Sequence, residues 1–258
     1  MGVKQLFDLA GRVAVITGGS RGLGLQIAEA LGEMGARIGI TARKKDELDE
    51  AVAHLKALGI AATPFVGDLG KRERIAPLVD ALMEKFGKVD VLVNNAGAVW
   101  GAPAEDHPVD AWDKLVNLNL SANFLLSQAI AKRSMIPAKW GRIVNVASVS
   151  GLIGTDPRLL NNVSYVATKH GVIGLTRQFA AEWGRHGITV NAICPGFFPS
   201  KMTHATLDAS GDFLRAATPN GRLGGEEDLK GLAVLLASEA SRHITGQAIA
   251  VDGGMTAI

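Results

Sequence analysis

One tyrosine occurs in the sequence, Tyr165, and Lys169 follows it by four residues. Side chains at i and i+4 of a helix share a face, so the lysine ammonium is expected beside the phenol. A free tyrosine has a pKa of about 10, and two unit charges about 4 Å apart interact by roughly 4 kcal/mol at an effective dielectric constant near 20. We therefore expect Lys169 to lower the pKa of Tyr165, as general acid–base catalysis requires. Such pairs also occur by chance on many helices.

The composition places the chain among soluble α/β proteins. It has 258 residues, 47% of them hydrophobic and 20% charged, with 31 glycines. The net charge is only +2 and the lysines and arginines are scattered, which disfavours nucleic-acid binding. The sequence contains neither a secretory signal nor an apolar run of about 18 residues, so no membrane-spanning helix is expected. The lone Cys194 excludes an intrachain disulfide and suits a reducing compartment, which predicts a cytoplasmic protein.

Short apolar runs rich in β-branched residues alternate with longer segments of helical period. Strict alternation of strands and helices predicts a mostly parallel sheet with right-handed crossovers. We therefore predict a single domain over residues 1–258, a doubly wound Rossmann fold with seven strands and helices on both faces. The expected strands cover 12–17, 37–41, 63–68, 89–94, 142–148, 188–193 and 247–252. Beyond the helix that follows the first strand, helices are expected near 45–59, 71–86, 108–135, 165–185 and 226–238.

A glycine-rich run, TGGSRGLG at 17–24, directly follows the first strand. Gly18, Gly22 and Gly24 lie at the strand-to-helix turn, where glycine lets the backbone approach a pyrophosphate and the free N–H groups of the helix start attract the anion. An isolated glycine cluster is equally compatible with a tight turn. Its position after the first strand of a doubly wound sheet favours a dinucleotide site.

The end of the second strand indicates which dinucleotide binds. NAD sites usually place a carboxylate there, where it accepts hydrogen bonds from the ribose hydroxyls. Here the strand ends in Arg43 and Lys44, and Arg21 stands in the glycine loop. These cations suit a 2′-phosphate, and cations at a helix start are unfavourable without an anion to offset them. We predict NADP(H) over NAD(H); a solvated helix start is the alternative.

Five features in order resemble the short-chain dehydrogenase/reductase family over nearly the whole chain. They are TGGSRGLG, NNAG at 94–97, Ser148, the Tyr165–Lys169 spacing and Pro195–Gly196. The resemblance implies an oxidoreductase in which Tyr165 is the general acid/base and Lys169 tunes it and grips the nicotinamide ribose. It also implies that Ser148 hydrogen-bonds the substrate oxygen and that Asn119 holds a water in the proton relay.

The same resemblance implies how the cofactor is held. Asp68 matches an aspartate that hydrogen-bonds the adenine amino group, and residues 94–97 match a segment that walls the adenosine pocket and braces the central sheet. Pro195 and Gly196 match the turn that lines the nicotinamide, and Ser200 replaces a threonine that commonly meets the carboxamide. The full predicted cofactor set is Gly18, Ser20, Arg21, Gly22, Leu23, Gly24, Arg43, Lys44, Asp68, Leu69, Asn95, Ala96, Gly97, Tyr165, Lys169, Pro195, Gly196 and Ser200.

Two segments bear on the substrate. The 17-residue gap from Ser148 to Tyr165 (165 − 148) is longer than in many family members, and we place the extra residues within 154–162, beside the expected substrate mouth. Residues 197–222 lie where the family has a mobile lid. Trp100, Phe197, Phe198, Phe213 and Leu214 are candidates for an apolar pocket or for ordinary core, and Lys201, Arg158 and Arg215 are candidates to meet an anionic substrate.

The predicted function is an NADP(H)-dependent oxidoreductase that interconverts a ketone, such as a 3-oxoacyl thioester or keto acid, and a secondary alcohol. Parts of the sequence are similar to gluconate 5-dehydrogenases and to 3-oxoacyl-thioester reductases. A sugar-acid or polyol dehydrogenase, and a non-catalytic NADP-sensing scaffold, are the alternatives. A small-molecule substrate is expected, with no nucleic acid, membrane or metal partner; the resemblance implies a homotetramer.

Overall fold

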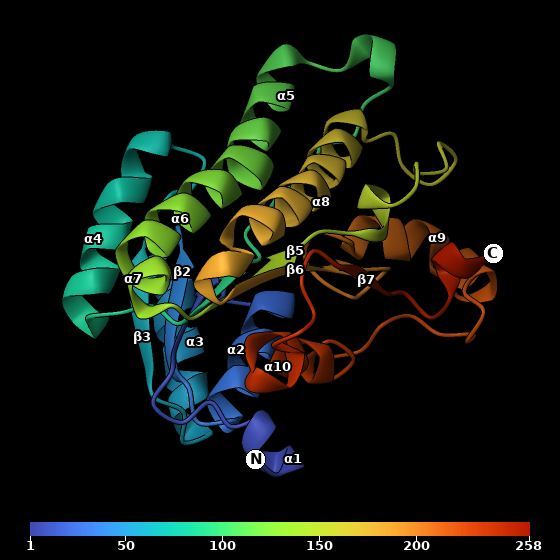
Figure 1. The fold of residues 1–258 in the computed structure, drawn as a ribbon. Helices are drawn as coiled ribbons and strands as arrows, with labels where there is room; N and C mark the ends of the chain where they lie inside the picture. The colour runs from blue at the N-terminus through green and yellow to red at the C-terminus, as the bar shows by residue number, and fades with distance from the viewer.

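The computed structural model describes all of residues 1–258 and contains one seven-stranded sheet. Every strand pair is parallel, and the strand order is β3-β2-β1-β4-β5-β6-β7 (Figure 1). The chain thus builds outward from β1 to one edge, returns to the centre at β4 and builds outward to the other edge. This is the predicted doubly wound fold. The strands are β1 Val13–Thr17, β2 Arg37–Ala42, β3 Ala62–Val66, β4 Val91–Asn94, β5 Gly141–Val146, β6 Ile188–Pro195 and β7 Ala248–Val251.

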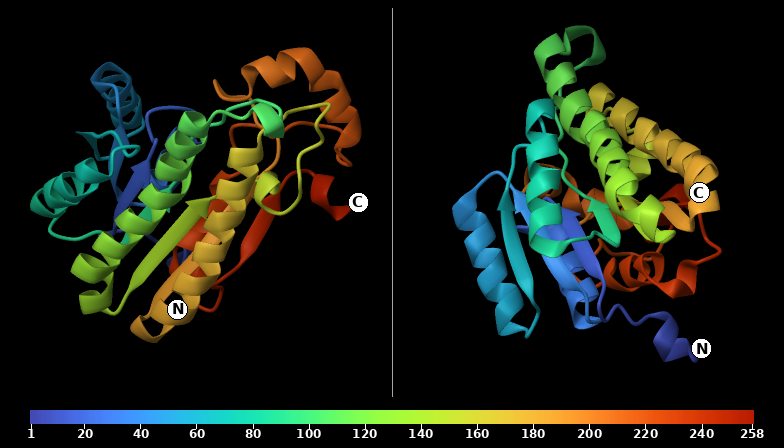
Figure 2. Two further views of the ribbon diagram at one scale, coloured as in Figure 1. Left: turned by 90° about the horizontal axis from the view of Figure 1, so that it is seen from above. Right: turned by 60° about the vertical axis from the view of Figure 1, so that its left-hand side comes forward.

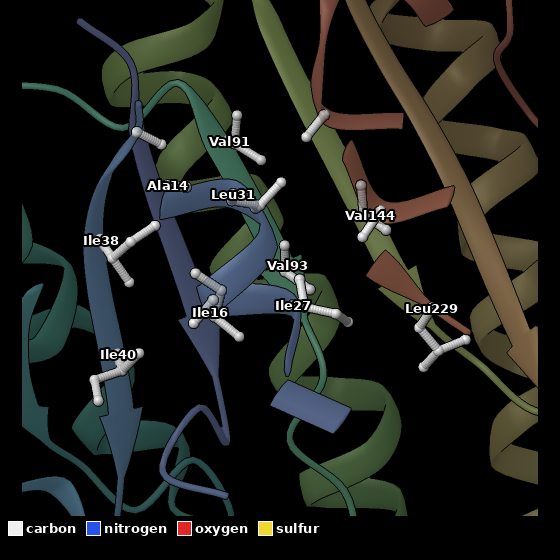
Figure 3. Packing of buried hydrophobic residues seen from close by; sticks show 14 of the residues in the cluster. Ala14, Ile16, Ile27, Leu31, Ile38, Ile40, Val91, Val93, Val144 and Leu229 are labelled. Carbon is white, nitrogen blue, oxygen red and sulfur yellow. The ribbon is translucent and has the colours of Figure 1, made fainter. Parts of the chain in front are cut away.

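The central strands are buried on both faces because helices cover both. In β1 all five residues are buried, with Ala14 and Ile16 in one hydrophobic cluster and Val15 in another. Figure 3 shows the first cluster, where Ile27 and Leu31 lie against side chains of the central strands. Successive side chains of a strand point to opposite faces, so a continuous apolar run is what two covered faces require.

Helices from distant parts of the chain form the two outer layers (Figures 1 and 2). One layer holds α2 Gly22–Glu33, α3 Lys45–Ala57 and α10 Lys230–Ala237, whose apolar residues join the first cluster. The other holds α4 Ile75–Phe86, α6 Ala122–Ile130 and α8 Val163–Trp183, whose apolar residues join the second. The remaining α-helices are α1 Val3–Leu6, α5 Val109–Leu115, α7 Ile136–Ala138 and α9 His204–Ala217. No helix is both long enough and apolar enough to cross a membrane.

Some predicted elements differ in detail from the observed ones. The helix expected over 71–86 begins as a 3₁₀ turn, Arg72–Arg74, and the helices expected around 108–135 include two π-helical segments, Val116–Ser121 and Ala131–Met135. The helix expected near 226–238 begins only at Lys230. Helix α9 was not predicted; it contains Gly211 and a non-helical Ser210, which weaken the helical signal of that segment.

A chain of buried polar side chains ties the sheet to its second helical layer. Asn94, at the end of β4, donates to Ser127 Oγ of α6 at 3.0 Å and to Asn145 Oδ1 of β5 at 2.9 Å. Asn145 in turn donates to Thr176 Oγ1 of α8 at 2.9 Å. All four side chains are buried, so each needs its partner. Asn94 therefore braces the central sheet, as predicted for the segment that it begins.

Replacing Asn94 should destabilise the fold. Asn94→Ala leaves Ser127 and Asn145 buried without their partner, and we expect the free energy of unfolding to fall by about 1–3 kcal/mol. Urea denaturation measures it, with Asn161→Ala, at an exposed position, as the matched control. Equal stability of the two variants would show that the network does not stabilise the sheet.

Candidate active site

The carboxyl ends of the strands surround a cavity of about 780 Å³. Ligands of open α/β sheets bind at this edge, where the strand order reverses. Every residue of the predicted cofactor set lines the cavity, and so does Ser148. Asn119 is the one predicted site residue that does not line the cavity. The sequence therefore predicted most of the residues that this cavity brings together.

The glycine loop fits tightly against the segment that follows β4. A Cβ on Gly24 would stand 2.4 Å from both Asn95 Nδ2 and Gly18 O, so no side chain fits there. Gly18 has a φ of +64°, which favours glycine. Asn95 Nδ2 donates to Thr17 O at 2.9 Å, and Thr17 Oγ1 accepts from the N–H groups of Asn95 and Ala96, each at 2.9 Å. This bare backbone at the start of α2 fits a pyrophosphate.

Charged residues from the glycine loop and from the start of α3 lie together at one end of the cavity. Arg21 Nη1 lies 2.7 Å and Lys44 Nζ 3.2 Å from one carboxylate oxygen, Oε1 of Glu47. The hydrogen bond from Lys44 and the charge of Arg21 hold the pKa of Glu47 below its ordinary value, against partial burial. Arg43 is exposed and lines the same cavity. Asp68 also lines it, and its Oδ1 accepts from Gly70 N at 3.1 Å.

Glu47 was missed at the sequence level. A carboxylate in the first turn of α3 is explained by the helix dipole alone. Only the tertiary structure shows that Arg21, 26 residues earlier, reaches it.

Ser148 and Tyr165 meet at the opposite end of the cavity. Ser148 follows β5 and caps a 3₁₀ turn, its Oγ accepting from Ser150 N at 3.1 Å. Tyr165 lies in the first turn of α8. Burial raises the pKa of the Tyr165 phenol, and its hydrogen bond with the Ser148 side chain partly opposes the rise.

The predicted effect of Lys169 on Tyr165 is wrong for this structure. Lys169 Nζ stands 5.5 Å from the Tyr165 ring centre, but it donates to Val146 O at 2.7 Å. Burial lowers the pKa of Lys169 to about 8, with the Cys194 thiolate form opposing the shift. Desolvation is therefore the main cause of both pKa shifts, and spacing along a helix cannot reveal how much water each side chain loses.

Asn119 supports this end of the cavity from a π-helical segment. Its Oδ1 accepts from Ala98 N and its Nδ2 donates to Ala98 O, both at 2.9 Å, and Nδ2 also donates to Thr168 Oγ1 at 3.2 Å. A Cβ on Gly97 would lie 3.3 Å from Asn119 Oδ1 and 3.8 Å from Lys169 Nζ. Glycine at 97 thus keeps open the space that Asn119 and Lys169 share.

The nicotinamide side of the predicted set lies on the remaining wall. Pro195 is the last residue of β6, and Gly196 N donates to Val251 O at 3.0 Å. Ser200 N donates to Thr203 Oγ1 at 3.0 Å. Cavity residues outside the predicted site are Thr41, Ala42, Glu47, Gly67, Ala98, Val99, Leu118, Val146, Ala147, Phe198, Lys201, Met202 and Thr203.

The substrate candidates divide between cavity, core and surface. Lys201 and Phe198 line the cavity, Phe198 also being part of the hydrophobic core. Trp100 and Phe213 are exposed and do not line it, and Leu214 is buried outside it. Arg158 and Arg215 do not line it; they pair with Asp156 and Asp212. None of residues 154–162 lines it either, so the placement of that insertion at its mouth is not supported.

Comparison with known proteins identifies the family. The family model for short chain dehydrogenases matches residues 12–210. The chain belongs to this family. The dehydrogenase is 39% identical to gluconate 5-dehydrogenase of Gluconobacter oxydans, with 99% of both chains covered. It is 36% identical to a 3-oxoacyl-[acyl-carrier-protein] reductase of Pseudomonas aeruginosa, over 96% of this chain and 98% of the reductase.

A solved structure shows the same likeness. The crystal structure of a gluconate 5-dehydrogenase from Burkholderia cenocepacia, in complex with NADP and tartrate, superposes with a TM-score of 0.93 at 36% identity, covering 100% of both chains. The dehydrogenase is an oxidoreductase by family. It contains no group of three or more His, Cys, Asp or Glu side chains placed to hold a metal ion.

The single tyrosine makes its ionisation directly measurable. We expect the tyrosinate absorbance of the folded protein to appear with a midpoint above the ordinary value of about 10, because burial disfavours the phenolate. Ser148→Ala should move it higher still. A midpoint below that of the guanidinium-unfolded chain would instead show that a cation controls Tyr165.

Proposed function

We propose that the dehydrogenase uses NADP(H) to interconvert a ketone and a secondary alcohol by hydride transfer, with Tyr165 as the general acid/base. One observation carries the proposal: Ser148, Tyr165 and Lys169 line one end of a cavity whose other end is a glycine cradle flanked by Arg21, Arg43 and Lys44. The cavity can therefore hold a hydride donor next to the proton donor Tyr165.

The cofactor assignment rests on chemical fit. The cradle of Gly18, Gly22 and Gly24 suits the pyrophosphate, and Arg43 is free of carboxylate partners and suits a 2′-phosphate. The other residues of the predicted cofactor set line the rest of the same cavity. When bound, the nicotinamide supplies or accepts the hydride. The related gluconate 5-dehydrogenase crystallised with NADP supports the same choice.

Side chains of the protein donate the proton, accept it and return it. In reduction, Tyr165 Oη gives its proton to the carbonyl oxygen while Ser148 Oγ hydrogen-bonds that oxygen and stabilises its developing charge. A raised phenol pKa keeps Tyr165 protonated and ready to donate near neutral pH. Lys169, when protonated, opposes that rise during alcohol oxidation, in which the phenolate must accept the proton. Asn119 holds the water that returns the proton.

The substrate has two candidate classes. Similarity over nearly the whole chain to gluconate 5-dehydrogenase favours a sugar acid or polyol, and Lys201 offers a cation at the cavity wall for its carboxylate. Similarity to a 3-oxoacyl reductase favours a 3-oxoacyl thioester or keto acid. In either case residues 197–222, including α9 and its irregular Ser210, act as a lid. The cytoplasmic homotetramer stays a prediction from the family resemblance.

A substrate panel tests the function. We expect NADPH to be oxidised with at least one member of a set containing a keto sugar acid, a ketose and a short 3-oxoacyl thioester. Tyr165→Phe should abolish that turnover and leave NADPH binding unchanged. Tight NADPH binding without turnover on any member would favour the scaffold alternative, and substantial activity of the variant would remove Tyr165 from its role.

Charge reversal at Arg43 tests the cofactor assignment. Arg43→Asp places a carboxylate where we expect the 2′-phosphate, so NADPH should bind about 10- to 100-fold more weakly while NADH binding holds or improves. Lys45→Asp, an equal reversal outside the cavity, is the control. Unchanged NADPH preference would rule out Arg43 as the phosphate-binding residue.

A further inference from the structure

Glu47 occupies an unexpected position within the charged end of the cavity. Its Oε1 receives both Arg21 Nη1, at 2.7 Å, and Lys44 Nζ, at 3.2 Å. Arg21 comes from the glycine loop and Lys44 is the N-cap residue of α3, just after β2, so one carboxylate oxygen joins the two segments that flank this end. All three residues line the cavity together with Arg43.

The two cations bind this oxygen as they would bind a phosphate oxygen. A guanidinium and an ammonium converging on one anionic oxygen form charge-assisted hydrogen bonds, which are the contacts expected to recognise a 2′-phosphate. The Glu47 side chain is 23% exposed, whereas those of Arg21 and Lys44 are 50% and 61% exposed. The carboxylate is thus the least exposed of the three side chains.

We propose that Glu47 is an internal competitor for the 2′-phosphate and thereby sets the ratio of NADP(H) to NAD(H) affinity. The inference rests on the proposed NADP(H) function. A 2′-phosphate must take Arg21 and Lys44 from Glu47, or share them with a carboxylate that repels it. A ribose with a free 2′-hydroxyl needs neither cation and leaves both ion pairs in place. Glu47 therefore weakens binding of the phosphorylated cofactor alone.

The charge balance agrees with this role. Without Glu47 the cluster of Arg21, Arg43 and Lys44 carries three positive charges; with it, two. Lys44 and Arg21 also hold the pKa of Glu47 below its ordinary value, so the carboxylate stays ionised near neutral pH. Arg43 has no carboxylate partner and remains available to a phosphate, which lets the site accept NADP(H) despite the competitor.

Glu47→Gln tests the proposal, because it removes the charge and keeps the shape. Calorimetric titration with adenosine 2′,5′-bisphosphate and with AMP, which differ only by the 2′-phosphate, measures the contribution of that phosphate without any turnover. We expect the variant to bind the bisphosphate about three- to tenfold more tightly than the wild type, as two partly exposed ion pairs allow, and to bind AMP as well as the wild type does. The gain should shrink at high salt.

Asp49→Asn is the matched control, since it removes the same charge from the same helix and breaks the Lys45 ion pair outside the cavity. It should leave both affinities unchanged. Weaker or equal binding of the bisphosphate by Glu47→Gln would overturn the proposal and make Glu47 a scaffold for the two cations. A wild type that binds the bisphosphate no better than AMP would overturn the NADP(H) assignment itself, and this proposal with it.

Discussion

The site depends on the contact between the glycine loop and the segment after β4. Thr17 Oγ1 accepts two backbone N–H groups from Asn95 and Ala96, and the Asn95 amide bonds the carbonyls of Thr17 and Gly18. These bonds join the ends of two strands that are adjacent in the sheet but 78 residues apart in the chain. A side chain at position 24 would collide with the Asn95 amide, so the absence of a Cβ is what lets the two segments close.

Beyond that junction, the sheet itself positions the other residues of the cavity. Parallel strands deliver their carboxyl ends to one edge, where β1 carries the cradle, β2 the cations, β5 the serine and β6 the Pro195–Gly196 turn. The central strands are buried on both faces and packed against helices, so the loops that they carry start from well-defined points. Buried amides such as Asn94 and Asn145 then couple the same strands to the helix that bears Tyr165 and Lys169.

Charge is divided unequally along the cavity. At the end with the glycine loop, Arg21 and Lys44 are exposed and paired with Glu47, so water and salt screen these charges. At the catalytic end Lys169 and Ser148 are buried, and desolvation dominates: it lowers the pKa of the lysine and raises that of the tyrosine. One end of the cavity is therefore electrostatically screened and the other is poorly solvated, and at the second end each hydrogen bond has a larger effect.

The sequence by itself determined the alternation of strands and helices, the glycine cradle, and the identity of Ser148, Tyr165 and Lys169 as a set, because these depend on local periodicity and on ordered motifs. Tertiary structure alone decided that Glu47 meets Arg21, that Asn119 projects from a π-helical turn toward Ala98, and that burial raises the pKa of Tyr165. These outcomes depend on distances between remote segments and on how much water each group loses, and neither quantity is encoded in spacing along the chain.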